Sequence, residues 1–252
     1  SNPYIIKTEN DFKSIQDGIK GGKSYKNKYF RLESDIKLSS SWEPLGTLKE
    51  RADKPGNGTN ILPFSGNIDG NGHTLTFAKG SKPLFGYVRD AKVSNLNIFG
   101  TYIDGYGLVE NYVVDYGKDG KNWTDDDPKA VITAEKVTIK SGTRIHQSGF
   151  LGGYASGIDH ADFTNCTIEQ GVTIGCNIDG TSAGLSNIGS FGGALNGTIK
   201  NCVSYATVYG DSNVGGIAGI RGQSTDIFSI ENCAFHGIIN ATGNNIGGIL
   251  GS

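Results

Sequence analysis

The sequence predicts an all-β protein, a right-handed parallel β-helix (solenoid) with a short N-terminal capping α-helix. Glycine provides 39 of the 252 residues, and short apolar phrases that contain glycine recur along the chain. A repeat of about 20–50 residues is typical of a solenoid, in which each turn buries its apolar face only by stacking on its neighbours. We therefore expect a single domain over residues 1–252, and we expect it to be part of a longer chain.

The composition argues against two classes of partner. The formal net charge is −2 and charges of both signs are interspersed, so no large electrostatic field favours nucleic acid or an anionic membrane. No apolar run approaches the roughly 20 residues that span a bilayer. We therefore expect neither nucleic-acid binding nor membrane insertion of this segment.

Residues 8–20 are predicted to form the capping helix. Thr8 and Asp11 have the spacing of a capping box at a helix N-terminus, and Gly21-Gly22 ends the helical pattern. The apolar residues recur at helical spacing, namely Phe12, Ile15 and Ile19. An isolated helix of this length is marginal in water, so we expect it to cover the open end of the solenoid.

Residues 28–100 are predicted to form the first coil turns. Apolar residues alternate or cluster over 28–32 and 36–38, as they do in strands. Residues 47–62 are polar and rich in breakers, which indicates an exposed loop. Residues 64–77 contain two strand segments joined by Asp-Gly-Asn-Gly, which indicates a sharp corner because glycine permits positive φ.

That corner carries Asp69 and His73, whose spacing suggests a general acid and base. The turn interpretation is stronger, because aspartate and asparagine tolerate unusual backbone angles and hydrogen-bond their own backbone. We therefore predict a structural turn and no catalytic residues here.

Two phrases repeat through the rest of the chain, including the later coil turns predicted over residues 144–252. The apolar-glycine phrase occurs at 84–86, 149–153, 189–193, 214–219 and 246–251. The strand phrase, in which asparagine precedes leucine or cysteine, occurs at 93–98, 163–168, 199–203 and 230–235. These copies predict equivalent positions on successive turns, with strands about 4.8 Å apart.

With these motifs the chain resembles the glycine-rich GLUG-repeat proteins of bacterial surfaces. Four elements carry the resemblance: Trp42 to Gly46, Phe64 to Leu75, Leu84 to Gly86 and Val214 to Gly219. Such repeats resemble stalk and adhesin regions of large surface proteins, including non-catalytic regions of immunoglobulin A peptidases. The resemblance implies a secreted or cell-surface location and further domains in the same polypeptide.

Residues 101–143 depart from the repeat and are predicted to be an inserted loop. Aromatic side chains concentrate there among glycine and aspartate, namely Tyr102, Tyr106, Tyr112, Tyr116 and Trp123. Such side chains can bind a glycan or protein, or they can dock the loop on the coil. Three consecutive carboxylates, Asp125, Asp126 and Asp127, are candidate calcium ligands without EF-hand spacing. Plain solvation on an exposed loop is the favoured explanation, and no other cofactor is predicted.

The cysteines occupy repeated positions. Cys166, Cys202 and Cys233 fall at equivalent strand positions and are expected to point inward as small buried hydrophobes. Adjacent turns would place their Cα atoms within disulfide range, but leucine serves at the equivalent Leu96. We therefore expect free thiols, including Cys176.

Two functions from different classes remain. The first is a non-catalytic module that binds a host or cell-surface glycan or protein through the aromatic insertion. The second is a β-helix polysaccharide lyase or glycoside hydrolase, which needs a pair of carboxylates on one face. Candidate acids are scattered through the repeat and indicate no evident pair, namely Asp104, Asp159, Asp162, Asp179, Asp211 and Asp226.

Overall fold

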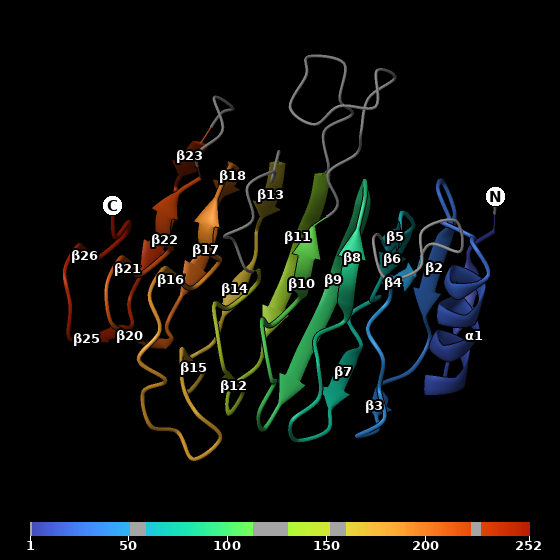
Figure 1. Cartoon of the computed structure of the whole chain (residues 1–252), viewed down its shortest axis with the longest axis horizontal. Helices are drawn as coiled ribbons and strands as arrows, with labels where there is room; N and C mark the ends of the chain where they lie inside the picture. Colours follow the sequence, from blue (N-terminus) through green and yellow to red (C-terminus); the bar gives the residue numbers. More distant parts are fainter. Residues whose placement is uncertain (1, 51–58, 113–130, 152–159, 223–227) are drawn as a thin grey trace.

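The predicted parallel β-helix is confirmed. A computed structural model describes residues 2–50, 59–112, 131–151, 160–222 and 228–252. Short strands pair in parallel with the turns before and after them, and the turns stack from the N-terminus to the C-terminus (Figure 1). Each turn therefore satisfies its backbone hydrogen bonds through its neighbours.

The largest sheet runs the length of the coil. Eight strands follow one another along it: β1 (Tyr4–Ile6), β2 (Tyr29–Leu32), β6 (Asn67–Asp69), β9 (Ala91–Gly100), β11 (Val131–Ile139), β13 (His160–Thr164), β18 (Gly197–Lys200) and β23 (Phe228–Glu231). Five further strands extend this sheet past a bend: β3 (Ile36–Leu38), β7 (Thr74–Phe77), β14 (Thr167–Ile168), β19 (Val203–Ser204) and β24 (Ala234–Phe235).

The other sides of the coil are smaller parallel sheets. One contains β12 (Arg144–Ile145), β15 (Thr173–Ile174), β20 (Thr207–Gly210) and β25 (Ile238–Ala241). Another contains β16 (Ile188–Gly189), β21 (Val214–Gly215) and β26 (Ile246–Gly247). Two pairs complete the set, β8 (Phe85–Val88) with β10 (Val109–Tyr112), and β17 (Gly192–Leu195) with β22 (Ala218–Arg221).

The bend in the largest sheet explains the repeated asparagines. In five successive turns the residue at this bend has a φ between 50° and 55°, namely Asn95, Lys136, Asn165, Asn201 and Asn232. Asparagine enters this left-handed region more readily than most residues, because its short polar side chain can hydrogen-bond locally. The residue after each bend then points into the core, which is why cysteine or leucine follows asparagine in the strand phrase.

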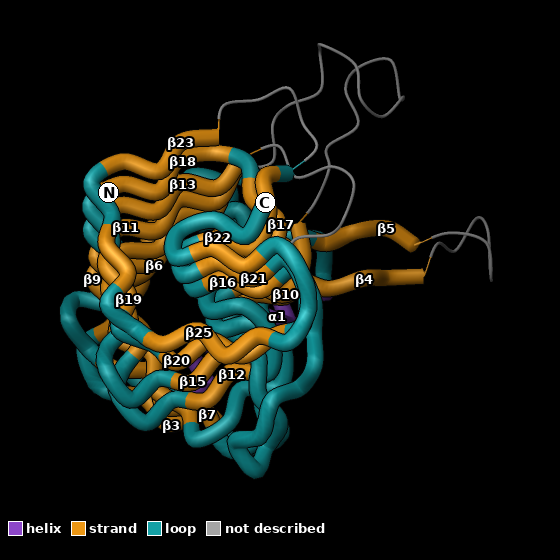
Figure 2. The backbone as a smooth tube through the Cα atoms, turned by 90° about the vertical axis from the view of Figure 1, so that its left-hand side faces the viewer, coloured by secondary structure: helices purple, strands orange, loops and turns teal. Residues whose placement is uncertain are grey.

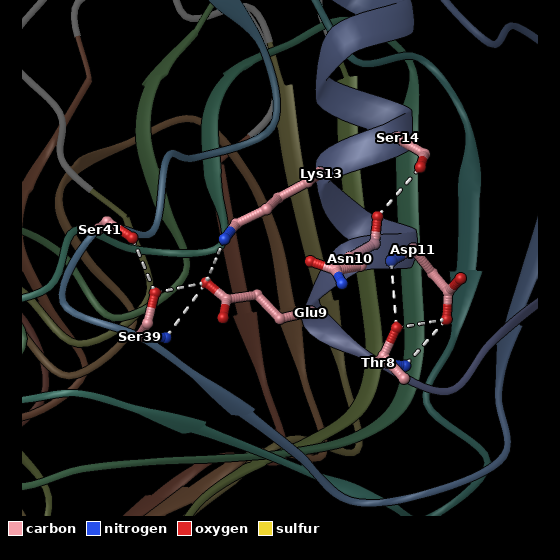
Figure 3. Close-up of polar contacts among 8 residues, drawn as sticks. All are labelled: Thr8, Glu9, Asn10, Asp11, Lys13, Ser14, Ser39 and Ser41. Carbon is pink, nitrogen blue, oxygen red and sulfur yellow. Dashed lines mark hydrogen bonds and ion pairs between the residues drawn. The ribbon is translucent and has the colours of Figure 1, made fainter.

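The helix α1 (Glu9–Lys20) lies at the N-terminal end of the coil (Figure 1). Its N-terminus is the predicted capping box: the Asp11 N–H donates to the Thr8 hydroxyl at 3.3 Å, and the Thr8 N–H donates to the Asp11 carboxylate at 2.9 Å (Figure 3). The Phe12 ring packs edge-on against Trp42, with centroids 5.6 Å apart. No described helix is long and apolar enough to cross a membrane.

Aromatic rings fill the core at successive turns. Phe64 lies between Phe30 and Phe85, with ring centroids 6.0 and 5.5 Å away. Further along, Phe150 stacks on Phe191 at 5.0 Å. Each fully buried phenylalanine contributes about 1.5–3 kcal/mol of transfer free energy, so these stacks hold neighbouring turns together.

Two regions differ from the sequence interpretation. Residues 101–143, expected to be an inserted loop, contain β10 and all of β11. Seven residues of β11 between Ile132 and Ile139 pair with β9 and extend the main sheet in register. Residues 47–62, expected to be a loop, contain the antiparallel pair β4 (Thr47–Glu50) and β5 (Thr59–Leu62), which projects from the coil (Figure 2). Both regions lack the glycine phrase, so their strands were not recognisable.

Candidate functional site

The structure separates the predicted aromatic residues. Tyr102 is buried, 7% exposed, and its ring meets His146 edge-on with centroids 6.2 Å apart. Tyr106 is only partly buried. Tyr112 belongs to the backbone of β10, but its side chain, like Tyr116 and Trp123, lies outside the described residues. Tyr102 therefore packs the coil, as the docking interpretation expects, and of the five predicted aromatic residues only Tyr106 has a described side chain that can contribute to a site.

Close to Tyr106 in the sequence, Glu110 on β10 has an unusual environment. Its Oε2 atom is buried and has no hydrogen-bond partner. The carboxylate lies over Gly105, where an added Cβ would come within 2.9 Å of Oε2, and Gly105 has a φ of +130° that favours glycine. A buried carboxylate oxygen without a partner is rare in folded proteins, so this position stands out.

Two charged side chains lie near Glu110. Lys82 Nζ and Asp104 Oδ2 form an ion pair at 3.0 Å, with both side chains nearly half exposed. Burial raises the pKa of Glu110; the Lys82 ammonium opposes this shift and the Asp104 carboxylate adds to it. Glu110 therefore carries a proton to higher pH than an ordinary glutamate.

Two tyrosines flank this carboxyl group. Tyr87 lies on β8, paired in register with Asn111 of β10, and Tyr106 precedes β10. Burial raises the pKa of both phenols, and the charge of Glu110 raises each further. The parallel pairing of β8 and β10 thus brings two turns of the coil to one polar and aromatic cluster.

We call Lys82, Tyr87, Asp104, Tyr106 and Glu110 the Glu110 cluster. Its hydroxyl, carboxyl and ammonium groups can hydrogen-bond a polyhydroxylated ligand, and its rings offer apolar surface. The described residues contain no group of three or more His, Cys, Asp or Glu side chains arranged to hold a metal ion. Asp125, Asp126 and Asp127 lie outside the described part of the chain, and the calcium hypothesis stays a prediction.

The Asp69 and His73 side chains are engaged in the turn. The Asp69 carboxylate accepts hydrogen bonds from the Asn71 N–H at 2.9 Å and from the Asn95 amide at 3.0 Å. His73 Nδ1 lies 3.3 Å from Asp35. These contacts join neighbouring turns of the coil and fit the structural interpretation of the corner.

The four cysteines are free. The Cys166 N–H donates to Cys202 Sγ at 3.3 Å, which confirms that these inward positions stack on consecutive turns. The side-chain hydrogen bond with Cys166 raises the pKa of Cys202 to about 12, and the equivalent bond with Cys202 raises the pKa of Cys233. The hydrogen bond with Cys202 lowers the pKa of Cys166, but this thiol is fully buried. Burial of Cys166 and the raised pKa values of Cys202 and Cys233 disfavour an accessible thiolate, so the stack is structural.

Sequence reasoning missed Glu110 and Tyr87. Glu110 lay inside the expected loop, where nothing assigned it to a strand or a face. Leu108 and Val109 are consecutive apolar residues and both are buried, so no alternation of apolar and polar residues marked Glu110 in the sequence.

Comparisons with known proteins show the fold alone. No protein-family model matches this chain, and no curated protein matches it. Among solved structures, a Bacteroides ovatus protein described as a "putative immunoglobulin A1 protease" is 20% identical over an alignment covering 98% of this chain and 71% of that one, with a TM-score of 0.59. Its name belongs to the class that the repeat resemblance suggested, and its structure agrees with a parallel β-helix.

Proposed function

We propose that this chain is a non-catalytic, secreted or cell-surface β-helix module that binds a glycan or protein through the Glu110 cluster. The buried, unpartnered Oε2 of Glu110 is the observation that carries the proposal. The Glu110 side chain as a whole is only partly buried, so a rotation of its carboxyl group would bring Oε2 to the surface. A ligand hydroxyl or amide that supplied the missing hydrogen bond there would relieve the cost of about 1–3 kcal/mol that an unsatisfied buried group imposes.

The chemistry of the cluster favours a ligand with hydroxyl groups. A protonated Glu110 can donate to a ligand oxygen, and its ionised form can accept from a ligand hydroxyl. Tyr87 and Tyr106 add hydroxyl groups and apolar ring surface, a combination suited to the polar edges and apolar faces of sugars. The name of the Bacteroides ovatus protein adds immunoglobulin A1 as a candidate protein ligand for this chain.

A second candidate function is polysaccharide cleavage. The raised pKa of Glu110 is the property required of a general acid, and Asp104 supplies a second carboxylate beside it. Asp104 is engaged in its ion pair with Lys82, which leaves its carboxylate less available to a substrate. We therefore place binding first.

The test compares the wild type with Glu110→Gln on a glycan array and on immobilised immunoglobulin A1. Glu135→Gln, an exposed glutamate on β11, is the matched control. We expect the wild type and the control to bind the same ligand, and Glu110→Gln to bind at least about tenfold more weakly, a change of about 1.4 kcal/mol. Release of reducing ends from a bound polysaccharide by the wild type would replace the binding proposal with the enzymatic one.

A further inference from the structure

Positive charge concentrates at the N-terminal end of the coil. Residues 18–32, from the end of α1 through β2, contain four lysines, one arginine and no acidic residue, although the whole chain carries a net charge of −2. Although the net charge of the whole chain is close to zero, basic residues are therefore concentrated in this segment. Such a surface attracts anions over about a Debye length, 8–10 Å at physiological salt.

Three of these lysines have no acidic partner among the described residues. Lys20 pairs with Glu43, and the Arg31 guanidinium donates to Asn71 Oδ1 at 2.9 Å. Lys23, Lys26 and Lys28 are exposed. Their ammonium groups remain available to an external anion.

The backbone holds this lysine segment in place. The Tyr25 ring packs edge-on against the core residue Phe30, with centroids 5.5 Å apart. The Ser65 N–H donates to the Ser24 carbonyl at 2.8 Å, which ties the segment to the next coil turn. The ammonium groups thus extend from a fixed scaffold, which reduces the entropy lost when a ligand binds.

An exposed aromatic residue follows the three lysines in the sequence. Tyr29 directly follows Lys28, and 53% of its surface is exposed on the outer face of β2. On the adjacent strand Tyr4 and Ile5 are also exposed, with 56% and 41% of their surfaces accessible. Two tyrosines and one aliphatic side chain do not form the broad apolar face that membrane insertion requires.

We propose that Lys23, Lys26, Lys28 and Tyr29 form a second binding site, which takes an anionic polysaccharide. Sulfate, phosphate or carboxylate groups of the polymer pair with the three ammonium groups, and one sugar ring lies against Tyr29. Nucleic acids fit less well, because their single strands are held by series of rings on which successive bases stack. The site is separate from the Glu110 cluster and does not depend on it.

The test measures binding to dextran sulfate and to uncharged dextran by biolayer interferometry at several salt concentrations. The triple variant K23Q/K26Q/K28Q removes the site. The control K37Q/K79Q/K136Q removes the same charge from exposed lysines on other parts of the coil. Circular dichroism confirms that both variants are folded.

We expect the wild type and the control to bind dextran sulfate but not dextran, and the site variant to bind at least tenfold more weakly. Each lost contact should reduce the dependence of log Kd on log salt by about 0.7, as for single-stranded polyanions. Tyr29→Ala should weaken binding without changing that salt dependence, and Glu110→Gln should bind as the wild type does.

Three results would overturn the proposal. The first is equal binding to dextran and dextran sulfate, and the second is equal loss in the site and control variants, which would indicate diffuse charge. The third is tighter binding to an oligothymidylate or to phosphatidylglycerol vesicles than to dextran sulfate.

Discussion

The side-chain amide of Asn213 donates a 2.8 Å hydrogen bond to Oδ1 of Asn187 on the preceding coil turn. Asn245 donates in the same way to Asn213 at 2.9 Å. All three residues have a φ between 56° and 59°. Asparagine thus serves this corner twice, because it tolerates left-handed backbone and its amide carries both a donor and an acceptor along the stack.

Substitution of Asn213 separates these two contributions. Asn213→Ala loses both amide hydrogen bonds and strains the backbone, so the free energy of unfolding should fall by about 2–4 kcal/mol. Asn213→Gly loses the bonds but tolerates positive φ, so it should be the milder change. Urea denaturation of both variants checks this order, and a more stable Asn213→Ala protein would contradict it.

The α1 cap should contribute strongly to stability. Phe12 is fully buried against Trp42, so Phe12→Ala should lower the free energy of unfolding by about 3–5 kcal/mol. Thr8→Ala removes the capping hydroxyl and should cost about 1 kcal/mol. Denaturation curves check both values, with the exposed helix residue Ser14→Ala as the control. Indistinguishable curves for Phe12→Ala and Ser14→Ala would show that the helix does not cap the core.

The raised pKa of Glu110 predicts a pH-dependent stability. Because the folded state holds this proton more tightly than the unfolded state, the wild type should lose stability as pH rises from about 4.3, the ordinary glutamate pKa, through the folded pKa. Glu110→Gln lacks this titration, so its melting temperature should gain on that of the wild type between pH 4 and pH 7.5. Glu135→Gln is the control, and a melting temperature of Glu110→Gln that falls relative to that of the wild type as pH rises would contradict the assignment.

We expect four free thiols per chain, which react slowly with a thiol reagent in the native protein. All four cysteines are free and three are buried, and Cys202 has a pKa raised to about 12. In denaturant, Ellman's reagent should titrate four thiols per chain. In the native protein at pH 8 each thiol should react at least about tenfold more slowly than free cysteine, because Cys166, Cys176 and Cys202 are buried and the pKa of the half-buried Cys233 is raised by its hydrogen bond with Cys202. A count below four in denaturant would reveal a disulfide.

The coil itself was predictable because its corners require particular residues. Asn165, Asn201 and Asn232 sit at positive φ once per turn, and the cysteine after each points inward, so the phrase repeats in the sequence with the geometry. The capping helix was predictable for a similar reason, since Thr8 and Asp11 are the residues that satisfy free N–H groups at a helix start.

The Glu110 cluster was not predictable, because parallel pairing brings its members together from different turns. Tyr87 and Glu110 lie 23 positions apart in the sequence, and only the register between β8 and β10 makes them neighbours. Tyr102 and Tyr106 are four residues apart, yet the first fills the coil and the second flanks the site. The composition of the segment does not distinguish these two tyrosines. The direction of each side chain depends on neighbouring strands that carry no glycine phrase and were therefore not predicted.

The most direct measurement is a calorimetric titration of the array-identified ligand into the wild type, Glu110→Gln and Glu135→Gln at pH 7.4. If the Glu110 cluster is the binding site, the wild type and Glu135→Gln will have the same Kd and Glu110→Gln will bind at least about tenfold more weakly. Equal affinities of all three proteins would contradict the assignment of ligand binding to Glu110.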